Sequence, residues 1–323
     1  MNRTLLTMAA AILVVAGGIR ASAATAEGSF QRTLEVRGLV DLDVRTGSGS
    51  IVVRTGPSDT VQIIGRIRAQ DTWFGMDAAE RVRRLEARPP IEQNGNTIRI
   101  GRIADRDLRN NISISYEILA PAETRLGSQT GSGHLVVEGI HGPVSAATGS
   151  GNLTIASIGD QVAATTGSGD VLLARIAGSV KTTSGSGDIR ALEISGGLNA
   201  RTGSGDVQAS MNAPGDAEIT TGSGDIAVSG IRGGFRSRAG SGDVTIAGEP
   251  MSAWSVSTGS GDILARIPQQ TPFDLRAENS SGRITTAHPL TDQSTGRHSL
   301  EGKAQGGGPL VALSAGFGNI RIE

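Results

Sequence analysis

One short phrase recurs along most of the chain and restricts its fold more than any other feature. The phrase is Gly-Ser-Gly-Asp followed by Val or Ile, and its six full copies begin at Gly167, Gly185, Gly203, Gly222, Gly240 and Gly259. Two earlier copies, at Gly131 and Gly149, carry His134 and Asn152 at the Asp position. Successive copies are 18 or 19 residues apart, which indicates a repeat protein with one small structural unit per repeat.

The residues between the phrases alternate in a way that is typical of β-strands. The residue after the Asp position is apolar in every copy, as at Val171, and the residue two places further on is apolar again, as at Leu173. A second apolar pair follows in most repeats, as at Ile176 and Val180, with a Gly or Pro turn between its members. This period of two predicts strands with one buried face, so that each repeat is strand, turn, strand, turn.

A single repeat of this kind is too small to be stable alone. About five inward side chains contribute ~1.5 to 3 kcal/mol each, whereas ordering the backbone costs ~1 to 2 kcal/mol per residue. The repeats must therefore stack, and stacking in register at ~4.8 Å builds a solenoid whose columns contain like residues. The sequence predicts an all-β fold, a right-handed β-solenoid (β-helix) with rungs of about 18 residues. An antiparallel sandwich is the alternative, although it does not require this period.

Composition excludes several classes of protein. The chain has 323 residues, no Cys and a formal charge of -1. It therefore has no disulfide framework, and it lacks the basic excess that is normal for nucleic-acid binding. Its few aromatic residues, 2 Trp, 1 Tyr and 5 Phe, suit the thin core of a solenoid.

Residues 1–23 have the pattern of a secretory signal peptide. An apolar run from Leu5 to Ile19 follows a short basic start, and Ala21-Ser22-Ala23 has the small residues of a cleavage site. The run is shorter than the ~20 residues that a membrane span needs, which favours cleavage over anchoring. We therefore expect an exported protein, periplasmic or at the cell surface, with no membrane span after cleavage. Residues 24–34 are expected to be a flexible lead.

The N-terminal part departs from the regular repeat. Residues 35–125 are expected to be β-rich, with one short amphipathic helix over 76–88 and a hairpin over 91–103. The open end of a solenoid would pair with other chains unless it is covered. The helix and the hairpin could supply that cover.

The regular solenoid is expected over residues 126–323. A polar, Gly-rich stretch around 291–308 predicts a loop that interrupts it. The chain ends on a phrase-like segment, Gly316 to Ile322, which predicts a last rung at the C-terminus.

The repeated phrase also resembles that of a known family. Copies such as Thr166 to Val171, which follow a strand that ends near Pro121, are similar to those of the bacterial "putative adhesin" family of unknown function and the related head-GIN domain. The resemblance covers nearly the whole mature chain and implies an exported β-solenoid. It carries over no catalytic motif, and this chain is more regular than most relatives.

The sharpest candidate site is a column of aspartates that stacking would create. Neighbouring carboxylates would lie ~5 Å apart and repel by about 1 kcal/mol per pair in water. A cation would relieve the repulsion, and Ca²⁺ fits best because the sequence offers only oxygen ligands; no other cofactor is expected. Alternatively, each carboxylate accepts backbone N–H groups in the Gly-rich turn. The candidate binding residues are Asp170, Asp188, Asp206, Asp225, Asp243 and Asp262.

A second candidate site is basic. Arg81, Arg83, Arg84 and Arg88 occur together on the predicted helix and could contact an anionic lipid or a polysaccharide. The alternative is a solvated helix face on which these arginines pair with neighbouring glutamates.

These features favour binding over catalysis. A carboxylate spacing of ~5 Å matches a retaining glycosidase pair, but it recurs along the whole column and singles out no site. Catalysis generally needs one irregular place that combines an acid, a base and a lid. We expect a non-enzymatic adhesion, binding or scaffold protein of the cell envelope, with a polysaccharide or a protein as its ligand. Weak contacts repeated along the rod would hold this ligand. The alternative is a polysaccharide-acting envelope enzyme on the same scaffold.

Overall fold

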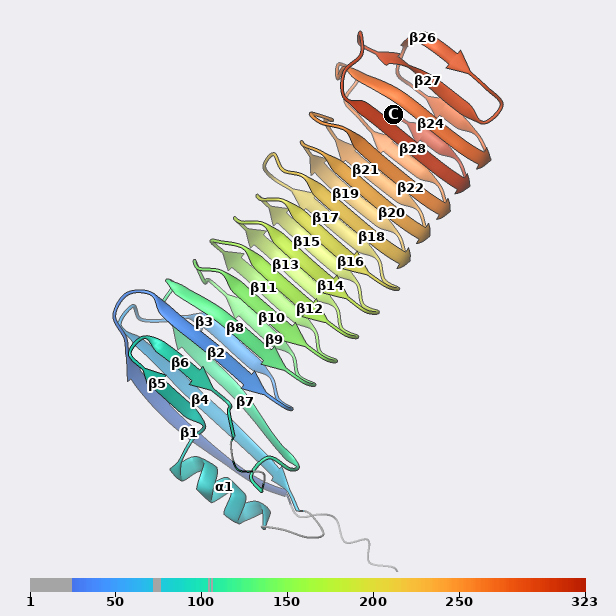
Figure 1. Ribbon diagram of the computed structural model, residues 1–323. Helices are drawn as coiled ribbons and strands as arrows, with labels where there is room; N and C mark the ends of the chain where they lie inside the picture. The colour runs from blue at the N-terminus through green and yellow to red at the C-terminus, as the bar shows by residue number, and fades with distance from the viewer. Residues whose placement is uncertain (1–24, 72–76, 104, 106) are drawn as a thin grey trace, which may run out of the picture.

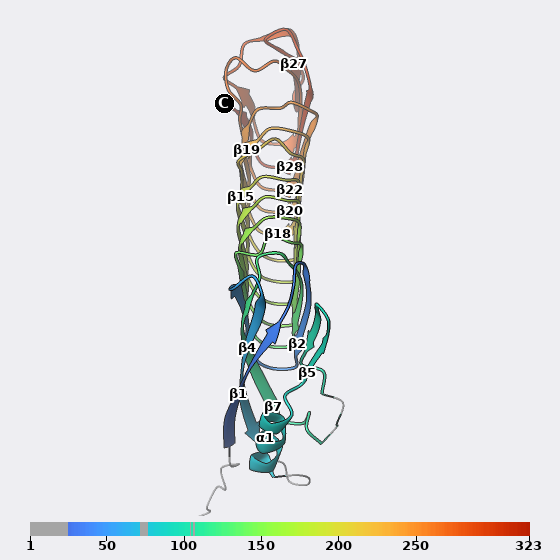
Figure 2. The same cartoon turned by 90° about the vertical axis from the view of Figure 1, so that its left-hand side faces the viewer.

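In a computed structural model, the chain forms an elongated rod of two facing β-sheets (Figure 1), and Figure 2 shows the sheets edge-on. The structure describes residues 25–71, 77–103, 105 and 107–323, so the expected signal peptide over 1–23 lies outside the described residues. Within them the chain has 29 strands and one helix, α1 (Ala78–Ala87). The expected all-β solenoid is thus confirmed.

The two sheets contain 14 and 15 strands among the described residues. Sheet A, from the N-terminal end of the rod, contains β1 (Thr25–Glu35), β4 (Thr60–Gln70), β7 (Ile112–Ala120), β3 (Ile51–Thr55), β9 (Leu135–Glu138), β11 (Leu153–Ile158), β13 (Val171–Ile176), β15 (Ile189–Ile194), β17 (Val207–Met211), β19 (Ile226–Ile231), β21 (Val244–Gly248), β23 (Ile263–Arg266), β29 (Ile320–Ile322) and β25 (Ile284–Thr286). Sheet B, from the same end, contains β5 (Ile91–Asn94), β6 (Thr97–Ile100), β2 (Val40–Thr46), β8 (Thr124–Thr130), β10 (Val144–Thr148), β12 (Val162–Thr166), β14 (Val180–Ser184), β16 (Leu198–Thr202), β18 (Ala217–Ser223), β20 (Phe235–Ser241), β22 (Trp254–Ser260), β28 (Leu310–Phe317), β24 (Phe273–Ser281), β27 (Ser299–Ala304) and β26 (Leu290–Thr295).

Each regular rung consists of one strand from each sheet and the turns that join them. Strands of neighbouring rungs are parallel and in register, so that Val171 of β13 pairs with Leu153 of β11 and with Ile189 of β15. Burial alternates along the strands, as in β12 and β14, where every second side chain is buried. The period of two in the sequence is therefore the alternation of core and surface.

The Gly-Ser-Gly-Asp phrase forms the turn from sheet B to sheet A. A Cβ on Gly169 would lie 1.9 Å from the carbonyl oxygen of Gly151 in the neighbouring rung, so the turns can stack only with glycine there. The Thr166 hydroxyl donates to the same Gly151 oxygen over 2.9 Å, and its oxygen accepts the Gly169 N–H at 3.1 Å. The buried Thr and the two glycines thus allow the turns of successive rungs to stack in register.

The expected flexible lead over residues 24–34 is wrong, because residues 25–35 form β1. This strand is 11 residues long and pairs antiparallel with β4 along its whole length. Phe30 anchors it: the side chain is buried, and its ring meets that of Tyr116 edge-on at 6.4 Å between centroids. The sequence of this strand does not alternate clearly between apolar and polar residues, because Phe30 is its one buried residue.

The helix and the hairpin of the N-terminal part are present. α1 begins at Ala78 and ends at Ala87, inside the expected 76–88, and residue 76 lies outside the described residues. It lies across β1 and β4 at the end of the rod (Figure 1), where Gly28 leaves room for Val82 and Glu86. β5 and β6 form the hairpin, which ends at Ile100 instead of 103. No helix in the described part of the chain is long and apolar enough to cross a bilayer.

Residues 40–55 belong to the rod itself. β2 pairs in parallel with β8, and β3 pairs in parallel with β9, with Ile51 opposite Leu135. The first copy of the phrase, at Gly47, stacks under the copy at Gly131, whose Cβ would lie 2.3 Å from the Gly47 oxygen. The chain between these two rungs loops out and builds the end of the rod.

The C-terminal strands lie in an order that corrects the expected last rung. β28 lies between β22 and β24, and β29 lies between β23 and β25. The end of the chain therefore does form a rung, but β24 and β25 form the rung outside it. Two segments that resemble the phrase, one before β25 and one before β29, could each follow the rung of β23, and sequence spacing does not indicate which one does.

The expected loop over 291–308 is also wrong in its larger part. β26 and β27 form an antiparallel hairpin, and β27 pairs antiparallel with β24. Leu300 and Ala304 are buried opposite Ala277 and Phe273 of β24. Their spacing of four residues gives this polar stretch one buried strand face, and the hairpin extends sheet B at the C-terminal end of the rod.

Candidate functional site

The six aspartates of the repeat form a continuous column at the turn from sheet B to sheet A. Each of the first five accepts, through Oδ1, the backbone N–H of the next aspartate in the column. The distances are 3.1 Å from Asp188 N to Asp170, 3.0 Å from Asp206 N to Asp188, and 2.8 Å for the bonds that Asp225, Asp243 and Asp262 donate. The carboxylates are therefore backbone acceptors, as the alternative interpretation expects, but the N–H group that each one accepts belongs to the turn of the next rung.

Uncharged side chains continue the column at both ends. Asn152 Oδ1 accepts the N–H of Asp170 at 3.0 Å, and His134 Nδ1 accepts the N–H of Asn152 at 3.2 Å. At the other end, Asn319 donates its N–H to Asp262 at 2.7 Å and accepts that of Arg283 at 3.0 Å. The position thus requires a hydrogen-bond acceptor and does not require a negative charge.

Cation binding by the column stays a prediction. Each Oδ1 of the column already accepts a backbone N–H, so the Oδ2 atoms are the carboxylate oxygens most available to a cation. Among the described residues, no group of three or more His, Asp or Glu side chains is arranged to hold a metal ion.

A long groove follows the opposite ends of the sheet B strands, where these strands begin. Its volume is about 1000 Å³, and residues from eight successive strands, β8 to β22, line it. Seven intervals of ~4.8 Å give a length of about 34 Å. Its outward-facing lining residues are Arg125, Ser145, Ala163, Lys181, Asn199, Glu218, Arg236 and Ser255.

The sequence analysis missed this groove. Its residues occupy a strand position that varies from repeat to repeat, and only stacking brings them into one line. The available signal is the mixture of small residues, such as Ser145 and Ala163, with long basic residues, such as Lys181 and Arg236.

The acidic and basic groups of the groove differ in their partners. Glu218 accepts hydrogen bonds from Asn199 at 3.0 Å and Arg201 at 3.2 Å, and Asp216 accepts the Gly234 N–H at 2.7 Å. The lining cations form no ion pair within the described part of the chain; these are Arg125, Lys181 and Arg236.

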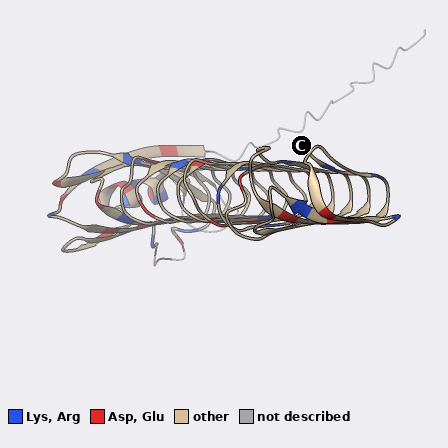
Figure 3. Cartoon of the chain, turned by 90° about the horizontal axis from the view of Figure 1, so that it is seen from above, with Lys and Arg blue, Asp and Glu red and all other residues tan. Residues whose placement is uncertain are grey.

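Charge elsewhere on the rod is mixed. Figure 3 shows Lys and Arg positions interspersed with Asp and Glu positions along the chain. Cations without an ion pair among the described residues also occur outside the groove, as at Arg238 and Arg283. The groove differs in that three such cations, Arg125, Lys181 and Arg236, lie along it.

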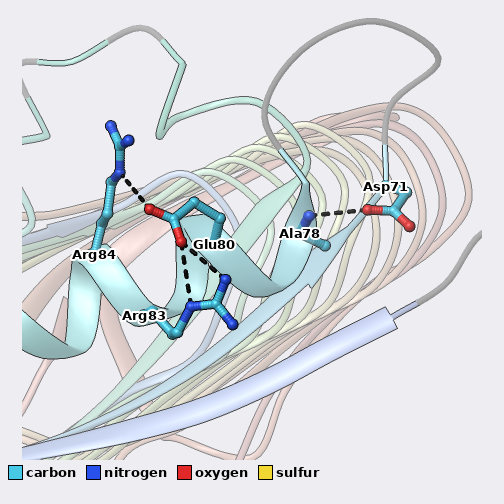
Figure 4. Close-up of polar contacts among 5 residues, drawn as sticks. All are labelled: Asp71, Ala78, Glu80, Arg83 and Arg84. Carbon is cyan, nitrogen blue, oxygen red and sulfur yellow. Dashed lines mark hydrogen bonds and ion pairs between the residues drawn. The ribbon is translucent and has the colours of Figure 1, made fainter.

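The arginines of α1 do not form one basic surface. Arg83 and Arg84 pair with Glu80 at 2.9 and 3.0 Å (Figure 4), and these hydrogen bonds, that of Arg83 first, hold the pKa of Glu80 below its usual range. Figure 4 also shows Asp71, which accepts the Ala78 N–H at 2.9 Å where the helix begins. Two of the arginines thus share one glutamate as their partner, as the solvated-face interpretation predicts.

Arg81 differs, and the expectation of a solvated side chain is wrong for it. It is 1% exposed, and its guanidinium donates to the carbonyl oxygens of Gln70, at 2.6 Å, and of Asn110. Arg81 lies on the buried stripe of α1 beside Val82 and Leu85. Its hydrogen bond to Gln70 therefore links the helix to the end of β4, and its buried guanidinium cannot contact a ligand in solution.

Comparisons with known proteins concern the family and the fold. The model of the Toastrack DUF4097 family matches residues 92–323. No curated protein matches the chain. Similar solved structures include a "putative adhesin" from Bacteroides fragilis NCTC 9343, which is 15% identical, with 92% of this chain and 97% of that chain covered and a TM-score of 0.31.

Two further structures are similar at comparable identity. A "putative cell adhesion protein" from Clostridium sporogenes ATCC 15579 is 12% identical, with 91% of this chain and 99% of that chain covered and a TM-score of 0.20. A "putative lipid binding protein" from Parabacteroides distasonis ATCC 8503 is 13% identical, with 91% and 96% covered and a TM-score of 0.44.

Proposed function

The chain belongs to the Toastrack DUF4097 family, whose model covers residues 92–323, and from that premise we propose that it is a non-enzymatic binding protein of the cell envelope. Its site is the groove along sheet B. Its ligand is an elongated anionic polymer, an acidic polysaccharide. The signal pattern over residues 1–23 supports a location in the periplasm or at the cell surface.

The continuity of the groove carries this proposal. Eight strands contribute to it at a constant interval of ~4.8 Å, so the backbone offers nearly the same surface at every rung. A ligand that is itself a repeating chain can contact several rungs at once. Weak contacts then add up, because each additional contact is intramolecular once the first has formed.

The charge of the groove supports an anionic ligand. Lys181 and Arg236 line it without an ion-pair partner among the described residues, whereas its acids are already hydrogen-bonded. The Asp column does not cancel this charge. From Lys181 to the end of its strand at Ser184 is already about 10 Å, at ~3.3 Å per residue, which exceeds the screening length of ~8 Å in physiological salt.

The spread of the ionisable groups supports a role without catalysis. Lys181 of β14 and Glu218 of β18 lie two rungs apart, or about 10 Å at ~4.8 Å per rung. A general acid or base must come within hydrogen-bond reach of the same reacting group. Groups distributed at rung intervals suit a chain-like ligand better than one reacting bond.

Binding of oligogalacturonates tests the proposal. We expect the wild-type protein to bind these acidic oligosaccharides more weakly as salt increases, and to bind neutral dextran oligomers weakly or not at all. Replacing Lys181 and Arg236 together by Ala removes two exposed charges of ~0.2 to 1 kcal/mol each, so affinity should fall roughly 2- to 30-fold.

The matched control replaces two exposed arginines on the outer face of sheet A, Arg190 and Arg266, by Ala. It makes the same change in net charge and leaves the groove intact. An equal loss of affinity in both double variants would mean that general charge, and not the groove, attracts the polymer. Absence of any binding by the wild-type protein would reject the proposed ligand.

A further inference from the structure

The rung formed by β28 and β29 is held in a slot made by earlier parts of the chain. In regular rungs, the chain leaves a strand of sheet A and enters sheet B at the next strand position along the rod, as from β21 to β22. From β23 to β24 the chain skips one strand position along the rod, because β28 and β29 occupy the rung between them. The last segment of the chain is therefore inserted between two rungs that precede it in sequence.

The slot holds this segment by contacts on both sides. Val311 pairs with Trp254 on one side and Leu275 on the other, in parallel register. Backbone bonds link Ile263 N to Asn319 O at 2.8 Å and Ile320 N to Arg283 O at 2.9 Å. Its inward side chains are at most 2% exposed; these are Val311, Leu313, Ala315, Ile320 and Ile322. An empty slot would thus have two open strand edges in each sheet, which readily pair with another extended chain.

A glycine-rich hinge precedes the segment. Gln305, Gly306 and Gly307 have φ angles of 50°, 88° and 89°, and Gly308 and Pro309 lead into β28. Glycines adopt both this compact turn and an extended path at little cost.

We propose that residues 309–323 are a donor strand that a second copy of this chain accepts in the same slot. The strand pairings of the segment are made with residues 254–286, and a further backbone bond joins Ala287 N to Ile322 O at 2.8 Å. Each copy possesses these partners, so exchange between copies retains the pairings. Only the hinge changes its path. Reciprocal exchange gives a symmetric dimer that joins two rods at their C-terminal ends.

Single-cysteine variants test this on the full chain, which has no Cys of its own. Ser257 of β22 and Ser314 of β28 are register partners on the outer face of sheet B. Two differently tagged copies, Ser257→Cys and Ser314→Cys, are mixed, partly unfolded, refolded at high concentration and oxidised. We expect disulfide-linked heterodimers, because the donor strand of one copy brings its Cys beside that of the other.

A control mixture pairs Ser257→Cys with Arg238→Cys of β20, which is also a register partner of Ser257. β20 lies within the regular rungs, so this mixture should give no heterodimer above the background of random collisions. When Ser257→Cys and Ser314→Cys are combined in one chain and oxidised before unfolding, the internal disulfide holds the segment in its own slot, and dimers should not form on refolding. Efficient internal linkage in that double variant, with no excess of heterodimer over the control in the mixture, would overturn the proposal.

Discussion

Replacing a single aspartate in the column separates its hydrogen bond from its charge. Asp206 accepts the N–H of Asp225 at 2.8 Å and donates its own N–H to Asp188 at 3.0 Å. Asp206→Ala removes the acceptor and should cost about 0.5 to 1.5 kcal/mol of unfolding free energy. Asp206→Asn keeps an acceptor oxygen at the same place, as Asn152 does naturally.

The Asn variant also relieves repulsion. With neighbours on both sides at ~5 Å, each pair costs about 1 kcal/mol in water before salt screening. This gain offsets the weaker bond to an uncharged acceptor, so we expect Asp206→Asn to lie within about 0.5 kcal/mol of the wild type. Its advantage over Ala should persist at high salt, because the hydrogen bond remains when repulsion is screened.

Urea unfolding followed by circular dichroism, with and without Ca²⁺ or EDTA, measures these differences. Transition slopes must be compared as well, since a repeat protein can lose rungs in steps. If Asp206→Asn destabilises as much as Asp206→Ala, the carboxylate charge is essential and the backbone role is insufficient. If Ca²⁺ stabilises the wild type but not the Asn variant, the column binds cations.

Three further predictions concern single buried positions. Gly169→Ala should destabilise by about 1 to 3 kcal/mol through its clash with the neighbouring turn, whereas Gly127→Ala, whose Cβ would have 3.7 Å of space, should change thermal stability little. Arg81→Ala should cost about 1.5 to 3 kcal/mol in urea unfolding, since it removes charged donors from buried carbonyls, and the exposed Arg83→Ala serves as control. Burial raises the pKa of Tyr116, so its contribution to stability is complete below about pH 10, the ordinary pKa, and declines above it. Tyr116→Phe should remove that alkaline decline, and an unchanged pH profile would contradict the assignment.

The regular part of the fold can be predicted from the sequence, because each rung repeats the same contacts with its neighbours. A Thr or Ser, two glycines and an acceptor recur at a fixed interval, and each has a role that depends only on the adjacent rung. The match to the Toastrack DUF4097 family confirms the family resemblance that the phrase suggests. The column of acceptors was predictable for the same reason.

The strand order at the two ends of the rod could not be predicted in this way. Residues 40–55 pair with a rung 84 positions further on, from Gly47 to Gly131, and the C-terminal phrase enters between two earlier ones. In both cases several phrase copies present nearly identical edges. Their order depends on small differences in long-range packing, which a repeat pattern does not encode.

The groove and Arg81 were missed for a different reason. Outward positions such as Ser145 and Lys181 look like ordinary surface residues until stacking aligns them. Arg81 lies on the apolar stripe of α1, but its charge suggests exposure. A long polar side chain that satisfies buried carbonyls is recognisable only when its partners are known.

The dependence of affinity on oligomer length tests the proposed binding mode most directly. The affinity of the wild-type protein for oligogalacturonates should rise with each added sugar until the chain fills the groove of about 34 Å, and should then level off. An affinity that is already complete for a mono- or disaccharide would contradict multivalent binding along the rod.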